Sequence, residues 1–245
     1  MQLKLSEEQQ RAIRELSRIT AGCCIVAIAA QWITVAATIA IAVHVNYWGG
    51  YAVAVVVVAS RQHALGVLMH DAAHYRLFSN RFANDWISNI FLAYPCGVST
   101  RLYRNHHAAH HLNLNGADDP DLQILLADEG NWGFPKLWHK GLLVFARDLF
   151  GVNAVSFAKY LGIWSPIQSP KTNWSERIPF GLWWLTAATV ISFTKGWLIF
   201  LLLWAVPIIT CTCLIFRLRA LAEHVGVKNE HELNATRVVL PYPYS

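Results

Sequence analysis

The stretch ITAGCCIVAIAAQWITVAATIAIAVHVNYWGGYAVAVVVVAS, residues 19–60, decides the fold class, because its 42 residues include no lysine, arginine, aspartate or glutamate. A bilayer core about 30 Å thick needs roughly 20 apolar helical residues, since unpaired backbone amides cannot be left in hydrocarbon. Residues 21–43 meet this length, and residues 50–69 form a second apolar segment after the aromatic turn at residues 46–50. We therefore expect a hairpin of two membrane-spanning helices.

A second apolar pair lies at residues 178–194 and 196–216, separated by Lys195. The chain of 245 residues is 55% hydrophobic and 14% charged, compared with about 25% charged in an ordinary soluble domain. This composition excludes a disordered chain, a coiled coil and a nucleic-acid-binding protein. We expect an all-α integral membrane protein, one domain over residues 1–245, with four transmembrane helices in two hairpins.

The charged residues indicate how the chain is oriented in the membrane. All 15 acids and 18 of the 20 lysines and arginines lie on the side opposite the two hairpin tips. The positive-inside rule therefore predicts that both termini and residues 71–177 are cytoplasmic, the latter as a helical cap. Ser6 and Gln9 form a capping-box pattern that predicts an amphipathic surface helix, and residues 82–96 have the apolar face of an interfacial helix. The five cysteines lack metal or disulfide spacing.

Histidines cluster in this cap, as HDAAH at 70–74 and HHAAHH at 106–111. On a helix, residues i and i+4 share a face, so His70 and His74 can bind one metal centre. His107, His110 and His111 share another face, although pairing of His106 with His110 is an alternative. Imidazole suits iron, zinc and copper, and five such ligands exceed what one metal with an open position needs. We predict a two-metal site.

Acidic residues accompany both clusters. Asp71 and the run Asp118-Asp119-Pro120-Asp121 (118–121) are candidates to orient the ligand imidazoles through hydrogen bonds, with His106 as a further candidate. The carboxylates of that run are also candidate ligands themselves. The same run follows Asn115-Gly116 and is equally typical of a solvated turn.

These boxes, together with RLRALAEH at 217–224 and the two-hairpin order, resemble the membrane fatty acid desaturase family, whose members are di-iron enzymes. The resemblance implies two iron ions, O2 as cosubstrate, a fatty acyl lipid substrate and oxidative desaturation in lipid metabolism. It also implies an external electron donor such as ferredoxin, rubredoxin or a cytochrome b5-like protein, because no flavin or haem motif is visible. The ligand set that it implies is His70, His74, His107, His110, His111 and His224.

One departure and several alternatives accompany that resemblance. Family members carry a third box, HxxHH, downstream of the motif that holds His224, and the sequence reaches Ser245 without one. We therefore expect a C-terminally incomplete copy, whose activity as a desaturase is in question. The alternatives are a related di-iron hydroxylase of alkanes, carotenoids or sphingolipids, an inactive truncated desaturase, and a non-enzymatic membrane protein that binds haem or transports a metal ion.

Overall fold

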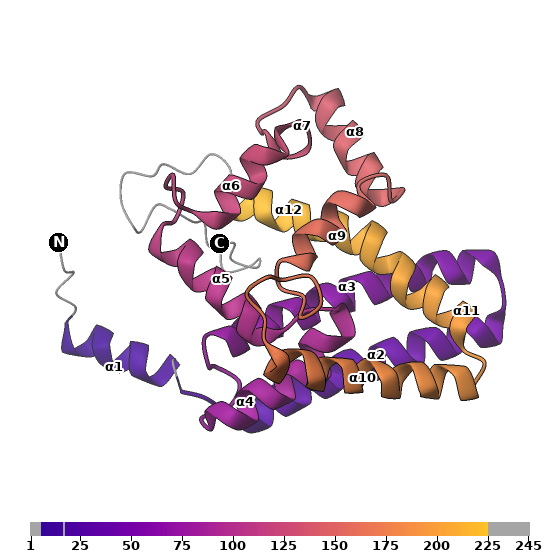
Figure 1. The fold of residues 1–245 in the computed structure, drawn as a ribbon, viewed down its shortest axis with the longest axis horizontal. Helices are drawn as coiled ribbons and strands as arrows, with labels where there is room; N and C mark the ends of the chain where they lie inside the picture. Colours follow the sequence, from indigo (N-terminus) through magenta and orange to yellow (C-terminus); the bar gives the residue numbers. More distant parts are fainter. Residues whose placement is uncertain (1–5, 17, 225–245) are drawn as a thin grey trace.

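The computed structural model describes residues 6–16 and 18–224, and every regular element among them is helical. Figure 1 shows the long helices side by side, with the shorter ones gathered toward one end. In chain order the elements are α1 (Glu7–Leu16), α2 (Ala21–Val45), α3 (Trp48–Ala73), α4 (Arg81–Ser88), η1 (Asn89–Ala93), η2 (Tyr94–Cys96), α5 (Thr100–Leu112), α6 (Pro120–Ala127), α7 (Glu129–Trp132), α8 (Trp138–Leu149), α9 (Ala154–Gly162), α10 (Trp174–Phe193), α11 (Trp197–Phe200), η3 (Leu201–Ala205), η4 (Ile208–Thr212) and α12 (Cys213–His224).

The first predicted hairpin is confirmed as a helical pair. Helices α2 and α3 pack along each other, and the chain reverses at Asn46, whose φ of 45° lies in the left-handed region that asparagine tolerates. Helix α3 continues to Ala73, four residues beyond the predicted end at residue 69. His70 therefore lies in the last turn of a long helix, which fixes the direction of its side chain.

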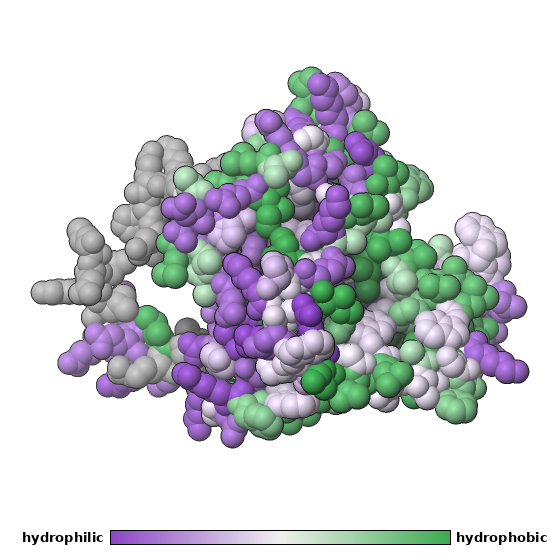
Figure 2. Space-filling view, viewed as in Figure 1, coloured by the Kyte–Doolittle hydropathy of each residue, from purple (hydrophilic) through white to green (hydrophobic). Residues whose placement is uncertain are grey.

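Three helices in the described part of the chain are long and apolar enough to cross a membrane: α2, α3 and the continuous helix Trp197–Glu223. The third combines α11, η3, η4 and most of α12, and its regular pitch is interrupted around Pro207, which has no N–H to donate. Helix α10 covers the predicted span at residues 178–194 but is not among the three. Figure 2 shows hydrophobic residues gathered over the half of the molecule that holds the long helices.

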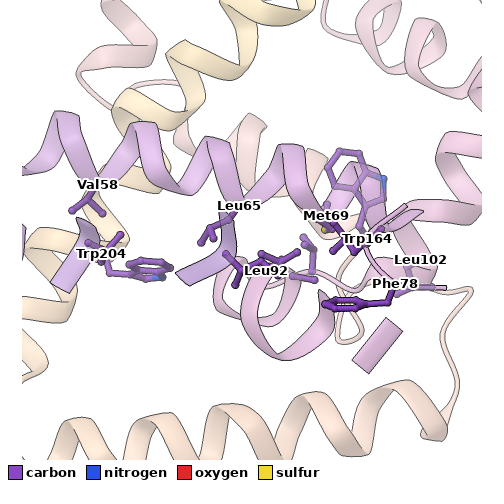
Figure 3. Close-up of a cluster of buried hydrophobic side chains, with 14 residues drawn as sticks. Val58, Leu65, Met69, Phe78, Leu92, Leu102, Trp164 and Trp204 are labelled. Carbon is purple, nitrogen blue, oxygen red and sulfur yellow. The ribbon is translucent and has the colours of Figure 1, made fainter. Parts of the chain in front are cut away.

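The core joins the first hairpin to the last long helix. The Trp204 indole stacks on Trp32 with ring centroids 5.5 Å apart, and its Nε1 donates to the Pro95 carbonyl at 3.0 Å. The buried Gln62 amide donates to the Trp204 carbonyl at 2.8 Å. Apolar side chains continue this core toward the histidine helices (Figure 3), among them Val58, Leu65, Met69, Phe78, Leu92, Leu102 and Trp164.

The predicted capping box is confirmed at the start of α1. The Ser6 N–H donates to the Gln9 side chain at 2.9 Å, and the Gln9 N–H donates to the Ser6 hydroxyl at 3.1 Å. The segment at residues 81–96 is helical throughout, with Phe82 and Trp86 exposed at its start and Tyr94 buried near its end. Its position at a membrane interface stays a prediction. The five cysteines are free thiols.

Candidate metal centre

Four histidines from two helices meet at one point. His70 and His74 lie at the end of α3, and His107 and His111 lie one turn apart on α5, which packs against α3. The Nε2 atom of His107 lies 3.1 Å from that of His74 and 2.9 Å from that of His111. Each of the four imidazoles has one ring nitrogen that lies within 4.8 Å of a ring nitrogen of each of the other three. The predicted i, i+4 pairs are therefore brought together into one cluster.

The cluster favours neutral imidazoles, which are the form that binds metals. Burial and the neighbouring imidazoles of His70 and His111 lower the pKa of His107 to about 3. Burial, followed by repulsion from neighbouring histidines, also lowers the pKa of His74 and of His111. The lone pairs of these three rings are thus available at neutral pH.

Arg104 joins the two histidine helices. Its Nε and Nη2 atoms donate to the carbonyl oxygens of Ala73 and Ala72 at 2.8 and 3.0 Å, where the end of α3 leaves carbonyls without helical partners. Its guanidinium also forms an ion pair with Asp85 on α4. Because Arg104 lies one turn before His107 on α5, this contact sets the distance between the two halves of the cluster.

A second group of possible ligands lies beside the first. His110 is buried, and its Nδ1 donates to Asp119 Oδ1 at 2.8 Å, with Asp121 Oδ2 at 3.5 Å. The Asp119 carboxylate also caps α6 by accepting from the backbone N–H of Asp121 and from that of Asn115. Asp119 is therefore held rigidly, and it directs the Nε2 atom of His110 away from itself.

Asp121 connects α5, α6 and α9. Its Oδ1 atom accepts from His106 Nε2 at 2.7 Å and from the Tyr160 hydroxyl at 3.2 Å. Burial alone would raise the pKa of this carboxyl, but the hydrogen bond and charge of His106 outweigh it and lower the pKa. His106 is thus held by an acid on α6, on a different side of α5 from the four-histidine cluster.

The remaining predicted residues lie in different environments. The Asp71 carboxylate is 3.6 Å from His70 Nδ1, at the edge of the cluster. Asp118 is exposed, whereas its neighbour Asp119 is buried and receives the hydrogen bond from His110. His224 is the last residue of α12, and its side chain lies outside the described residues.

A cavity of about 200 Å³ adjoins the histidines. His70, His107 and His110 contribute to its wall, and most of the rest is apolar. Typical small-molecule sites enclose about 300–1,000 Å³, so this space suits a segment of a chain-like substrate. The apolar wall comes from α3, η1, α9, the last long helix and the connections before α5 and after α9. It includes Met69, Leu92, Val98, Phe157, Leu161, Trp164, Ile208 and Phe216.

Several residues at this site were not singled out from the sequence. Tyr103 stacks on His107, with centroids 5.1 Å apart and planes 14° apart, and Arg104 anchors the end of α3. Their spacing was a usable signal, because residues three and four positions before His107 share its helical face. Arg219 and Glu223 pair at 2.8 Å beside the cavity, within the motif from which only His224 was selected.

The geometry agrees with the comparison to known families. The model of a family described as fatty acid desaturase matches residues 46–244. The chain belongs to the fatty acid desaturase family. It is also 30% identical over 89 residues to the Delta(5) fatty acid desaturase fat-4 of Caenorhabditis elegans. That aligned segment is 36% of this chain and 20% of the relative. No solved structure matches the chain.

The four-histidine cluster has a geometry that could hold a metal ion. An ion that binds imidazole nitrogens at about 2.1 Å would require those nitrogens to lie within about 4 Å of one another. The Nε2 atom of His107 meets this requirement with those of His111 and His74, at 2.9 and 3.1 Å. Imidazole donors are also suited to iron.

Proposed function

We propose that this protein catalyses the O2-dependent desaturation of a fatty acyl chain at a di-iron centre. The observation that carries the proposal is the meeting of His70 and His74 with His107 and His111 beside an apolar cavity. The proposed ligands are His70, His74, His107, His110, His111 and His224. Two irons are proposed because these imidazoles exceed what one metal with an open position needs, and His110 lies outside the four-histidine cluster.

The surrounding residues support this proposal by holding the ligands. Asp119 orients His110 through Nδ1, which leaves Nε2 for a metal. Arg104 holds the end of α3 against α5, so the two pairs of histidines keep their separation. We assign Asp121 and His106 to the supporting structure around His110, with Asp71 in the same role beside His70.

The chemistry explains why histidine ligands and an apolar cavity occur together. A methylene group has no acidic proton and no leaving group, so acid–base or nucleophilic side chains cannot act on it. The irons, when bound, supply the oxidising power through O2. The reaction joins O2 with two hydrogens of the chain, two protons and two electrons to give two waters and a double bond. The electrons come from an external donor of the ferredoxin, rubredoxin or cytochrome b5 type.

We also propose that α10 crosses the membrane, which gives four spans in two hairpins with both termini and the histidines on the cytoplasmic side. Its support is the charge distribution and the sharp turn at Lys195, which has a φ of 54° between α10 and α11. The test is labelling of Lys195→Cys and Asp118→Cys by an impermeant maleimide in sealed vesicles. Labelling from opposite faces is expected, and labelling from the same face would refute this topology.

The proposed activity is tested with the purified chain in lipid nanodiscs, supplied with iron, a reducing system and acyl lipids of several kinds. Iron content, oxygen uptake and product mass are measured together. Loss of two hydrogens from the acyl chain is the expected result. Gain of one oxygen would assign a hydroxylase instead, and a chain that binds no iron would refute the di-iron proposal.

A further inference from the structure

Helices α8 and α9, between the histidine cap and α10, are joined by a bend of 72°. The bend is centred on Gly151, whose φ of 71° is a conformation that glycine adopts without strain. Figure 1 shows the two helices meeting beside the last long helix, away from its ends. Both helices pack on η4, which lies within the membrane-spanning helix Trp197–Glu223. The depth of this bend can therefore be measured against a span.

Contacts along that span show that the segment descends and then returns. Asp148, near the end of α8, forms a buried ion pair with Arg217. Three residues later, Gly151 approaches Thr210, such that a Cβ at Gly151 would lie 3.5 Å from the threonine methyl group. Thr210 is the middle residue of Trp197–Glu223. Seven residues of helix separate Arg217 from Thr210, which is about 10 Å along the span. The long Arg217 side chain covers part of this distance, and the chain descends over the remainder between Asp148 and Gly151.

Helix α9 then returns to the level of Asp148, near the end of α8. The rings of Phe157 and Tyr160 both pack on Phe216, at 5.7 and 5.3 Å between centroids. Phe216 adjoins Arg217, so the chain has returned to the starting depth within ten residues. The segment therefore enters and leaves the membrane on the same side, which is the side that holds the histidines.

The surface of the bend is suited to lipid. Residues 149–158 include no Lys, Arg, Asp or Glu. Leu149, Phe150 and Val152 are 41, 78 and 62% exposed, and such exposure is unfavourable in water but not in hydrocarbon. The nearest basic residues, Arg147 and Lys159, are both exposed and flank this run, where their long side chains can extend toward lipid headgroups.

The backbone of the bend also meets the requirement that hydrocarbon imposes, which is that every N–H has a partner. The N–H groups of Gly151 and Val152 donate to the carbonyls of Asp148 and Arg147 at 3.0 and 2.8 Å. The Ala154 N–H donates to Gly151 at 3.1 Å. The Asn153 amide donates to the Asp148 carboxylate at 2.6 Å, so the polar side chain at the tip faces the protein.

We propose that α8 and α9 form a re-entrant hairpin whose bend is buried among the acyl chains of the leaflet on the histidine side. The exposed face of the bend contacts the lipid bilayer, because the bend lies beside the middle of a membrane-spanning helix. The inner face of α9 contributes Phe157, Tyr160 and Leu161 to the cavity. Helix α9 thus forms part of the wall between lipid and the histidine site. This inference rests on the membrane spans and not on desaturase activity.

Spin labels at defined positions test the depth of the bend in the full chain reconstituted in nanodiscs. Val152→Cys is labelled and compared with Ile33→Cys, an exposed position midway along α2, and with Asp118→Cys in the cap. The ratio of collision with O2 to collision with a water-soluble nickel complex reports depth, and the five native cysteines are replaced by alanine so that the introduced cysteine carries the label. Val152 is expected to match Ile33, and a ratio equal to that at Asp118 would overturn the proposal. Phe150→Cys serves as a second position if Val152→Cys does not fold.

A second measurement separates a re-entrant hairpin from a broken helix that crosses the membrane. Lys136→Cys and Lys171→Cys flank the segment and are exposed to an impermeant maleimide in sealed vesicles of one orientation. Labelling is read by mass spectrometry of the peptides that contain these positions, so the native cysteines do not contribute. Labelling from the same face is expected, whereas labelling from opposite faces would refute the hairpin. Iron binding and turnover play no part in either readout.

Discussion

The Nε2 atoms of His74 and His107 lie 3.1 Å apart, although 33 residues separate them in the chain. His74 ends α3, and His107 faces it from α5 with His111 on its other side, 2.9 Å away. His107 is therefore the central member of the cluster. Removing its imidazole disrupts contacts with both neighbours, whereas removing a peripheral histidine disrupts fewer.

His107→Ala is expected to lower iron affinity at least tenfold and to abolish turnover, because a central ligand is lost. The membrane fold should remain, since the long helices and their core are unchanged. Iron per chain, measured after size-exclusion chromatography, checks the prediction. His139→Ala is the control, because His139 is exposed beside Trp138 and away from the cluster. Unchanged iron content in His107→Ala would refute the ligand assignment.

Asp119→Asn should lower iron affinity about 10–100-fold, because His110 loses the carboxylate that orients it. The amide can still cap α6, so the helix itself should be retained. Iron titration of the purified variant measures the effect. The matched control is Asp118→Asn, at the exposed neighbouring position. Equal affinities of the two variants would show that Asp119 does not act through His110.

Arg104→Lys should loosen the contact between α3 and α5. A lysine keeps the charge but cannot bind two carbonyls and the Asp85 carboxylate with one planar group. We expect a loss of about 1–3 kcal/mol in stability, the cost of leaving the buried Ala73 carbonyl unpaired, together with weaker iron binding. Thermal unfolding in detergent and iron titration measure the two effects. Arg11→Lys on the exposed helix α1 should change neither.

Asp148→Asn should destabilise the fold by about 3–5 kcal/mol, because it leaves the buried Arg217 without its counter-charge. Replacing both residues, as Asp148→Leu with Arg217→Met, should cost much less because no buried charge remains. The thermal midpoints of the two variants in detergent provide the comparison. A double variant less stable than the single one would contradict the assignment of this pair as structural. Glu129→Gln, at an exposed position, is the surface control.

Gly66 tests the use of the cavity by substrate. It lines the cavity, and a Cβ at this position would meet no atom within 4 Å. Gly66→Ala is expected to raise stability by about 0.5–1 kcal/mol through helix propensity. Gly66→Leu should reduce the turnover of long acyl chains about tenfold or more relative to shorter ones.

Product analysis with acyl chains of graded length measures this selectivity. Gly22→Leu is the matched control, because a Cβ at Gly22 is equally unobstructed and this glycine faces outward from α2, away from the cavity. An identical change in chain-length preference in both variants would place the substrate elsewhere.

Much of the local structure could be predicted from sequence because it depends on neighbours in the chain. The charge-free stretch at residues 19–60 indicated the first helical hairpin, and Ser6 with Gln9 indicated the capping box. The i, i+4 spacing of the histidines indicated which of them share a face. Segments that mix apolar and polar residues were harder to predict. Helix α10 is less hydrophobic than the three long apolar helices, and the sequence of residues 138–162 gave no sign of a bent pair of helices.

Helical structure, apolar spans and two ligand-spaced groups of histidines all follow from the order of residues in the chain. Which groups meet depends on packing, because the distance between His74 and His107 is set by the way Arg104 and the core dock α5 on α3. Packing likewise selected Asp119 over Asp118, since two adjacent residues with the same side chain differ only in the direction that the fold gives them. Helical periodicity and charge act within one segment, whereas contacts between distant segments follow from packing.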